Sequence, residues 1–213
     1  PPKYYRRFIE RAHALIGENV ELRFAMQTNG TLLTPEWCQL FAEKNIGLSF
    51  SIDGPERQND RYRLDRKGRG SFARVMHGWT MAQESGLRPG VLLVIDPQSD
   101  PIEMYEFLKS LNPSTVDFLL PDATHDKPPP FFDGVSTLYA NWLLRVFNAW
   151  EEEGGAGLKI RIFLQLMRSL IGFEEGYDVL GQGNIEVLAV ETDGEIQPLN
   201  RLRLCADGFE HTP

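Results

Sequence analysis

The stretch from Leu22 to Pro55 constrains the fold of this chain more than any other. A short apolar run ends at Asn29-Gly30, a turn signal that predicts the end of a strand. Thr34-Pro35 then suits the start of a helix, because Thr is a good N-cap and Pro is favoured in the first turn. A second short apolar run stops at Asp53-Gly54. Two strands joined by one helix predict a βαβ unit with a right-handed crossover in a parallel sheet.

Polar residues stand at the carboxyl ends of both predicted strands. Gln27 and Asn29 end the first strand, and Ser51 and Asp53 end the second. Because the strands are expected to be parallel, these residues should emerge on one edge of the sheet. That edge is where ligands bind in parallel α/β folds. We therefore expect a binding site there.

The alternation of strands and helices persists through the rest of the sequence. Ser71 is expected to cap the helix that follows it, and the apolar run over 90–95 is typical of a strand buried on both faces. Further helices are predicted over 1–16, from Asp100, over 135–153 and over 163–173, and further strands over 114–120, 159–163, 185–190 and 196–198. This order predicts an α/β fold, a partial (β/α) barrel with a C-terminal β-hairpin.

Composition sets limits on function. The protein has 213 residues and a net charge of -8, which suits one medium globular domain and argues against a nucleic-acid partner. No apolar run approaches the roughly 20 residues that a membrane-spanning helix needs. The two cysteines are far apart, so a disulfide framework is not expected. A cytoplasmic protein without a membrane partner is the expectation.

Several motifs, in their order and spacing, resemble the middle of radical S-adenosylmethionine (radical SAM) enzymes. Gln27-Thr28-Asn29-Gly30-Thr31-Leu32-Leu33 is followed at βαβ distance by Ser51-Ile52-Asp53-Gly54-Pro55. The pattern continues with Asp60-Arg61-Tyr62-Arg63, Gly68-Arg69-Gly70-Ser71-Phe72 and Leu120-Pro121-Asp122-Ala123-Thr124-His125-Asp126. The branch that the sequence resembles is the peptide maturases with a SPASM-type C-terminal extension, related to anaerobic sulfatase-maturating enzymes. The last motif is similar to those of cyclophane-forming and FxsB-like maturases.

This resemblance implies S-adenosylmethionine (SAM) and a [4Fe–4S] cluster as cofactors. A reductant such as ferredoxin or flavodoxin would drive cleavage of SAM, and the resulting radical would attack a side chain of a ribosomal peptide or protein, cross-linking or oxidising it. The SAM contacts that the resemblance implies are Ser51, Gln27, Asn29, Arg63 and Leu120. Arg63 would meet the SAM carboxylate, for which a planar guanidinium is suited. Asn29 could instead fix its own loop, which is the simpler hypothesis.

Cysteine usage limits the activity that this polypeptide can have by itself. Radical SAM enzymes hold the cluster with a CxxxCxxC motif, whereas the only cysteines here are Cys38 and Cys205. We therefore expect the cluster ligands upstream, in a longer parent enzyme, and the polypeptide alone to be inactive. The hairpin turn at Asp193-Gly194 resembles the start of a SPASM domain, although Asn200 stands where that pattern has a cysteine. Cys205 could be an auxiliary-cluster ligand or a small buried residue, and Cys38 is expected to be structural.

The proline-rich segment after Leu120 is expected to be a substrate loop. It follows a strand at the carboxyl edge and is too rich in proline for a helix or a central strand. The polar residues of this substrate loop are Asp122, His125 and Asp126. They could form a metal cluster, but local hydrogen bonding within the loop is the simpler interpretation.

Two other functions remain open from the sequence. One is a non-catalytic peptide-binding module, a barrel that has lost its cluster. The other is a barrel hydrolase that uses carboxylates, the candidates being Asp53, Asp122, Glu191 and Asp193.

Domain boundaries and one loop complete the expectations. We predict the central part of a radical SAM barrel over 1–134, a helical connection over 135–184 and the start of a SPASM-like region over 185–213. The charged stretch over 56–70 is expected to be a solvated loop with local ion pairs.

Overall fold

A four-stranded parallel sheet forms the centre of the protein. In the computed structural model, which describes residues 1–17, 19–123, 127–134, 137–155, 157–173 and 188–197, the strand order is β1-β2-β3-β4. The strands are β1 (Ala25–Thr28), β2 (Gly47–Ser51), β3 (Gly90–Val94) and β4 (Val116–Leu119). All three neighbouring pairs are parallel, which confirms the predicted βαβ unit and the α/β fold.

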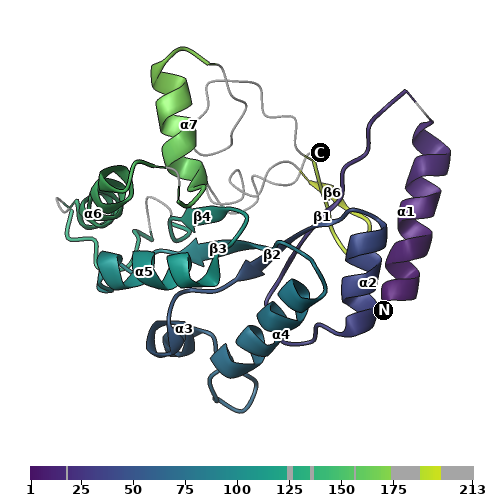
Figure 1. Ribbon diagram of the computed structural model, residues 1–213, viewed down its shortest axis with the longest axis horizontal. Helices are drawn as coiled ribbons and strands as arrows, with labels where there is room; N and C mark the ends of the chain where they lie inside the picture. The colour runs from purple at the N-terminus through teal and green to yellow at the C-terminus, as the bar shows by residue number, and fades with distance from the viewer. Residues whose placement is uncertain (18, 124–126, 135–136, 156, 174–187, 198–213) are drawn as a thin grey trace.

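Three helices and a shorter one described below connect these strands, and two of the three are capped by the residue that precedes them in the sequence. They are α2 (Pro35–Glu43), α4 (Phe72–Glu84) and α5 (Pro101–Leu111). Thr34 caps α2 by accepting a hydrogen bond from the Trp37 amide at 3.5 Å, and Asp100 caps α5 by accepting from Ile102 at 2.9 Å. In Figure 1 the sheet runs through the middle of the molecule, with α4 on one side of it and α7 on the other.

The two faces of the sheet differ in chemistry. Side chains directly opposite each other in a parallel pair point the same way, so the register assigns residues to a face. One row, Phe50, Val91 and Val116, is fully buried against the helices, where the ring of Phe50 packs edge-on against Trp79 of α4. We call this the outer face. The inner face carries the alternate positions, which are Ala25, Gln27, Gly47, Ser49, Ser51, Gly90, Leu92, Val94, Asp117 and Leu119.

The inner face of β3 corrects the expectation that this strand is buried on both sides. Val91 and Leu93, on the outer face, are buried, but Leu92 is only half-buried and Val94 is exposed. A strand that lines an open barrel has a covered face and an accessible one, so a continuous apolar run does not require burial on both.

The segment over 159–163, predicted as a strand, is mainly helical. Ile160 forms a single parallel bridge with Val116, which extends the barrel beyond β4, and α7 (Arg161–Leu170) begins at the next residue. The preceding helix, α6 (Leu138–Glu152), packs its Trp142 ring against Phe118 of β4. The region after β4 therefore shares the core of the sheet.

The stretch over 56–70, predicted as a solvated loop, contains a short helix. It forms α3 (Glu56–Tyr62), whose buried residues are Gln58 and Asn59, followed by an antiparallel bridge between Leu64 and Gly70. Because the inward-facing residues of α3 are polar, hydrophobic periodicity gives no sign of this helix.

Both ends of the described sequence also follow the prediction. The helix α1 (Pro2–Ile16) forms as expected, although Ile9 is its only buried residue. The predicted hairpin is present as β5 (Ala189–Val190) paired antiparallel with β6 (Ile196–Gln197). None of the described helices is long and apolar enough to cross a membrane.

Candidate functional site

Gln27 and Ser51, both predicted site residues, meet at the carboxyl edge of the sheet. The Gln27 Nε2 donates to the Ser51 Oγ at 3.0 Å, across the neighbouring strands β1 and β2. Both residues lie on the inner face, where Ser51 is largely buried and Gln27 is exposed. The bond leaves the Ser51 hydroxyl proton, the second N–H of Gln27 Nε2 and the Gln27 carbonyl oxygen able to bond a ligand. The pair therefore offers two donors and a carbonyl acceptor on the inner face.

Asn29 fixes the loop after β1, as the simpler hypothesis predicted. Its Oδ1 accepts from the backbone amide of Thr31 at 3.2 Å and from the Thr31 hydroxyl at 3.0 Å, an Asx-type turn. Gly30 follows with a φ of 71°, and a Cβ on it would overlap the ring of Phe50. Only glycine combines this backbone conformation with so close an approach. The loop after β1 therefore packs closely against Phe50, in the core on the outer face of the sheet.

Arg63, a third predicted site residue, is bound by Asp53 at the end of β2. Its Nε and Nη2 donate to the two carboxylate oxygens of Asp53 at 2.6 and 2.9 Å, a bidentate ion pair. Asp53 Oδ1 also accepts the backbone amide of Val94 at 3.1 Å, so the carboxylate joins β2 to β3 where the strands end. The sequence places Asp53 only in a turn, and its ion pair with Arg63 comes from the tertiary structure.

A series of hydrogen bonds extends from Asp53 to the start of α4. The amide of Asp53 donates to Asn59 Oδ1 at 3.3 Å, and Asn59 Nδ2 donates to Asp60 Oδ1 at 3.0 Å. The same Asp60 oxygen accepts the amides of Ser71 and Phe72 at 2.9 and 2.8 Å. Asp60, and not the Ser71 side chain predicted for this role, therefore caps α4.

Two more aspartate–arginine pairs lie at this side of the sheet, and sequence analysis missed both. Arg61 of α3 donates to Asp96 at 3.0 Å, beyond the end of β3. Arg161, the first residue of α7, donates to the buried Asp117 of β4 at 2.8 Å. The signal available in the sequence was the single charged residue inside the apolar strand over 114–120. Charged residues inside strands are rarely buried without a partner.

The proposed substrate loop begins at Leu120, which is exposed just beyond β4. Asp122 is exposed as well, while His125 and Asp126 lie outside the described residues. Further along, the hydroxyl of Tyr139 on α6 donates to the Pro130 carbonyl at 3.1 Å and fastens the loop. Phe131 has a φ of 64°, a conformation that bulky residues rarely adopt.

The donor set decides which cofactor these residues can hold. The hydroxyl of Ser51, the amide of Gln27 and the guanidinium of Arg63, gathered at the carboxyl edge of the sheet, suit the carboxylate, amine and ribose of SAM. Among the described residues, no group of three or more His, Cys, Asp and Glu side chains could hold a metal ion. Cys38 is buried in α2, as expected of a structural residue, and Cys205 lies outside the described residues. These side chains therefore fit SAM and do not fit the cluster.

The carboxylates of the hydrolase hypothesis are dispersed. Asp53 is committed to the pair with Arg63, and Asp193 Oδ1 accepts the Glu195 amide at 3.0 Å within the hairpin turn that also holds Glu191. Asp122 lies in the substrate loop. The four carboxylates thus come from three separate parts of the fold.

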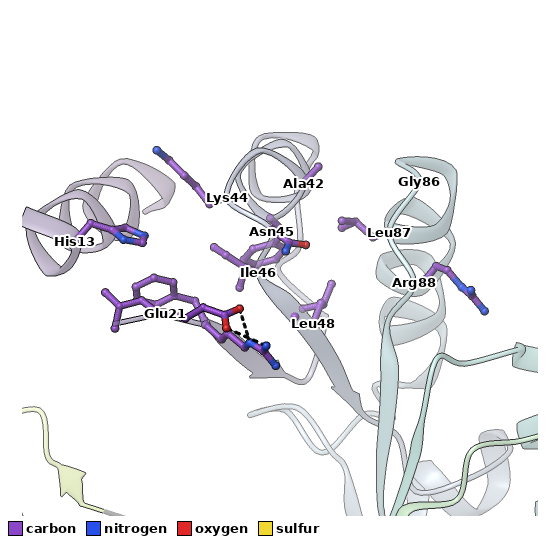
Figure 2. A pocket seen from close by; sticks show the side chains of 15 residues that line it. His13, Glu21, Ala42, Lys44, Asn45, Ile46, Leu48, Gly86, Leu87 and Arg88 are labelled. Carbon is purple, nitrogen blue, oxygen red and sulfur yellow. Dashed lines mark hydrogen bonds and ion pairs between the residues drawn. The ribbon is translucent and has the colours of Figure 1, made fainter. Parts of the chain in front are cut away.

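A large cavity lies at the opposite, amino edge of the sheet. Figure 2 shows this cavity, of about 960 Å³, between the ends of α1, α2 and α4, with His13, Lys44 and Arg88 around it. None of the predicted site residues that the structure describes lines it. Its position separates it from the carboxyl edge, where the polar strand ends gather.

The clearest pKa shift also lies away from the site. Burial, followed by the hydrogen bond to Glu153, raises the pKa of Tyr105 to about 12. Tyr105 is a buried residue of α5, and its hydroxyl donates to Glu153 at 2.9 Å.

Comparison with known proteins bears directly on this geometry. The family model described as the Radical SAM superfamily matches residues 1–111, more than half of the sequence. The matched range includes β1, β2, β3 and every residue of the Gln27–Ser51 and Asp53–Arg63 pairs.

Curated relatives point to the same group. The protein is 28% identical over 189 residues to the serine-type anaerobic sulfatase-maturating enzyme of Bacteroides thetaiotaomicron, covering 80% of this chain and 46% of that enzyme. It is 24% identical over 204 residues to the cysteine-type enzyme of Clostridium novyi, covering 92% of this chain and 54% of that enzyme. The chain thus spans about half the length of these relatives.

Solved structures share the fold. The structure of native anSMEcpe with bound AdoMet superposes with a TM-score of 0.79 at 20% identity, covering 94% of this chain and 57% of that one. The structure of the same protein with AdoMet and the Kp18Cys peptide gives a TM-score of 0.76. At this level of identity the likeness establishes the architecture alone.

Proposed function

Because this chain belongs to the radical SAM superfamily, we propose that it is the SAM-binding and substrate-facing part of a peptide or protein maturase. The observation that carries the proposal is the polar inner face, where the Gln27–Ser51 pair stands beside the Asp53–Arg63 pair. The two relatives described above are sulfatase-maturating enzymes, and the anSMEcpe structure that shares the fold holds AdoMet and the Kp18Cys peptide. The parent enzyme would cleave SAM reductively and oxidise or cross-link a side chain of a ribosomal peptide or protein.

The residues described above would bind and orient SAM. Ser51 and Gln27 would offer hydroxyl and amide donors and a carbonyl acceptor to its polar groups, and Arg63 would meet its carboxylate. Asn29 would act indirectly, by holding the loop beside them. Leu120 would contribute apolar contact with the adenine.

The cluster would be held by other residues of the parent protein. When bound, such a cluster would supply the electron for reductive cleavage of SAM, and the cleaved SAM would take up a hydrogen atom from the substrate residue. Thiolates in a CxxxCxxC motif hold such a cluster, and this sequence contains no such motif. Cys205 is a candidate ligand of an auxiliary cluster in a SPASM-like region that would begin near 185.

The remaining assignments complete the proposal. The segment over 1–134 would form the central barrel, and 135–184 a helical connection to the SPASM-like region. The segment with Asp122, His125 and Asp126 would be the substrate loop. The reductant would be ferredoxin or flavodoxin in the cytoplasm, with neither nucleic acid nor membrane as a partner.

The test uses the complete encoded protein, purified without oxygen and reconstituted with iron and sulfide. We expect about four or more irons per polypeptide, as a [4Fe–4S] centre requires, and release of 5′-deoxyadenosine from SAM with a strong reductant. The mass of a candidate peptide encoded beside the gene should then decrease by that of the hydrogen removed, which mass spectrometry measures.

Absence of iron and of SAM cleavage would contradict the proposal. That result would favour the non-catalytic peptide-binding module, for which binding of the same candidate peptide without any mass change is the expected behaviour. SAM cleavage without peptide modification would leave the radical chemistry in place and reject the candidate substrate.

A further inference from the structure

Asp53 is held in place from three directions at the end of β2. Its carboxylate receives two bonds from Arg63 and a third from the Val94 amide. Its own amide is fixed by Asn59, which is completely buried. The side chain of Asp53 is 12% exposed. A carboxylate with so many partners is a rigid point in the structure.

Arg63 keeps binding capacity after it has paired with Asp53. A guanidinium has five N–H donors, and Asp53 occupies the edge formed by Nε and Nη2. The other edge, formed by Nη1 and the second N–H of Nη2, can bind another carboxylate in the same bidentate manner. The Arg63 side chain is 27% exposed, so it is not closed off inside the protein.

The position of the pair links it to the inner face. Asp53 comes two residues after Ser51, the last residue of β2, and its carboxylate accepts the amide of Val94, an inner-face residue of β3. A ligand that meets the Ser51 hydroxyl therefore lies within reach of an arginine that Asp53 orients.

We propose that Asp53 is a positioning residue that orients Arg63 so that its remaining guanidinium edge binds the carboxylate of SAM. This inference rests on the proposed function, and it assigns to Asp53 a role that acts only through Arg63. A flexible arginine loses side-chain entropy when it binds, and a pre-formed ion pair removes that cost from the binding step. Asp53 thus strengthens SAM binding although it does not touch SAM.

The alternative is that Asp53 supports only the fold, or attracts the cationic groups of SAM directly. Both alternatives predict an effect of Asp53 that persists when Arg63 is absent. The positioning role predicts that the effect disappears. A double-mutant cycle distinguishes these cases.

The experiment measures SAM affinity by equilibrium dialysis on the complete, reconstituted protein under anaerobic conditions. The variants are Asp53→Asn, Arg63→Gln and the double substitution. Asp65→Asn is the matched control. Like Asp53, Asp65 is a carboxylate paired with arginine, here with two of them, and its side chain is 13% exposed. It differs in position, because it lies in the hairpin after α3. Unfolding midpoints are recorded for each variant.

We expect Asp53→Asn to weaken SAM binding about tenfold, the scale of a lost charge-assisted hydrogen bond. The double variant should bind no more weakly than Arg63→Gln alone, and Asp65→Asn should bind as the wild type does. If Asp53→Asn does not fold, Asp53→Glu replaces it. Its effect on SAM affinity is likewise expected to disappear when Arg63 is replaced by Gln.

Two results would overturn the inference. One is an unchanged SAM affinity in the Asp53 variant. The other is that the Asp53 substitution lowers SAM affinity equally in the wild-type protein and in the Arg63→Gln variant. Failure of the wild-type protein to bind SAM would instead reject the proposed function, so the two failures are distinguishable.

Discussion

The two faces of the same sheet follow different rules. On the outer face, Phe50, Val91 and Val116 are almost completely buried, and their side chains make the core with the helices. One residue further along β1 and β2, the inner face carries small or polar groups, among them Gln27, Ser49 and Ser51. Alternation along a strand therefore separates stability from binding without any change of secondary structure. The outer face determines whether the protein folds, and the inner face determines what it can bind.

The largest expected effect is on the outer face. Phe50→Ala should lower the free energy of unfolding by about 3–5 kcal/mol, because it removes a fully buried ring and leaves a cavity. Urea denaturation followed by circular dichroism measures this loss. The neighbouring inner-face substitution Ser49→Ala is the control, and a comparable loss there would break the distinction between the faces.

A smaller effect is expected at the connection between the site and α4. A Cβ at Gly70 would overlap the carboxylate of Asp60, which caps α4. Gly70→Ala should therefore cost about 1–2 kcal/mol, the scale of a lost helix cap. Thermal unfolding measures the change.

The matched control for this substitution is Gly157→Ala, because a Cβ at Gly157 would meet nothing within 4 Å. Equal unfolding midpoints for the two variants would show that the Asp60 cap contributes nothing to stability.

Substitutions on the inner face should change SAM affinity more than they change the stability of the fold. Ser51→Ala removes the hydroxyl that accepts from Gln27, and we expect SAM affinity to fall about 2–10-fold, as for one hydrogen bond of about 0.5–1.5 kcal/mol. Equilibrium dialysis of the complete protein measures it. Ser49→Ala, one inner-face position earlier, should leave affinity unchanged, and equal losses in both variants would count against a specific contact at Ser51.

The smallest effect on stability at neutral pH is expected from the hydroxyl of Tyr105, which is buried on α5. The pKa of Tyr105 is raised from 10.0 to about 12 in the folded protein, so the folded state holds its proton more tightly than the unfolded one. Its contribution to stability is fully present below pH 10 and should be lost as the pH rises through about 12. Urea denaturation between these pH values should show a steeper loss for the wild type than for Tyr105→Phe.

Much of the fold could be predicted because hydrophobic runs mark strands and outer-face helices directly. The strands β1 to β4 and the helices α2, α4 and α5 all have such a signal. The helix α3 could not be found in this way, since it buries Gln58 and Asn59 and not apolar residues. At 159–163, the alternation of apolar and charged residues favoured a strand, yet Ile162 and Phe163 are buried from a helix.

The candidate site was predictable only as far as strand ends go. The meeting of Gln27 and Ser51 follows from parallel strands that end on one edge. The pairing of Asp53 with Arg63 does not, because an unpredicted helix turns the backbone between them. The aspartates that hold Arg61 and Arg161 are likewise 35 and 44 residues distant in sequence, and no local pattern links such residues.

The most direct test of the account is a crystal structure of the complete protein with SAM bound. The account predicts SAM on the inner face, with its carboxylate on the free edge of Arg63 and a polar group within hydrogen-bond distance of the Ser51 hydroxyl. SAM located elsewhere, for example in the cavity beside His13 and Arg88 at the amino edge, would contradict it.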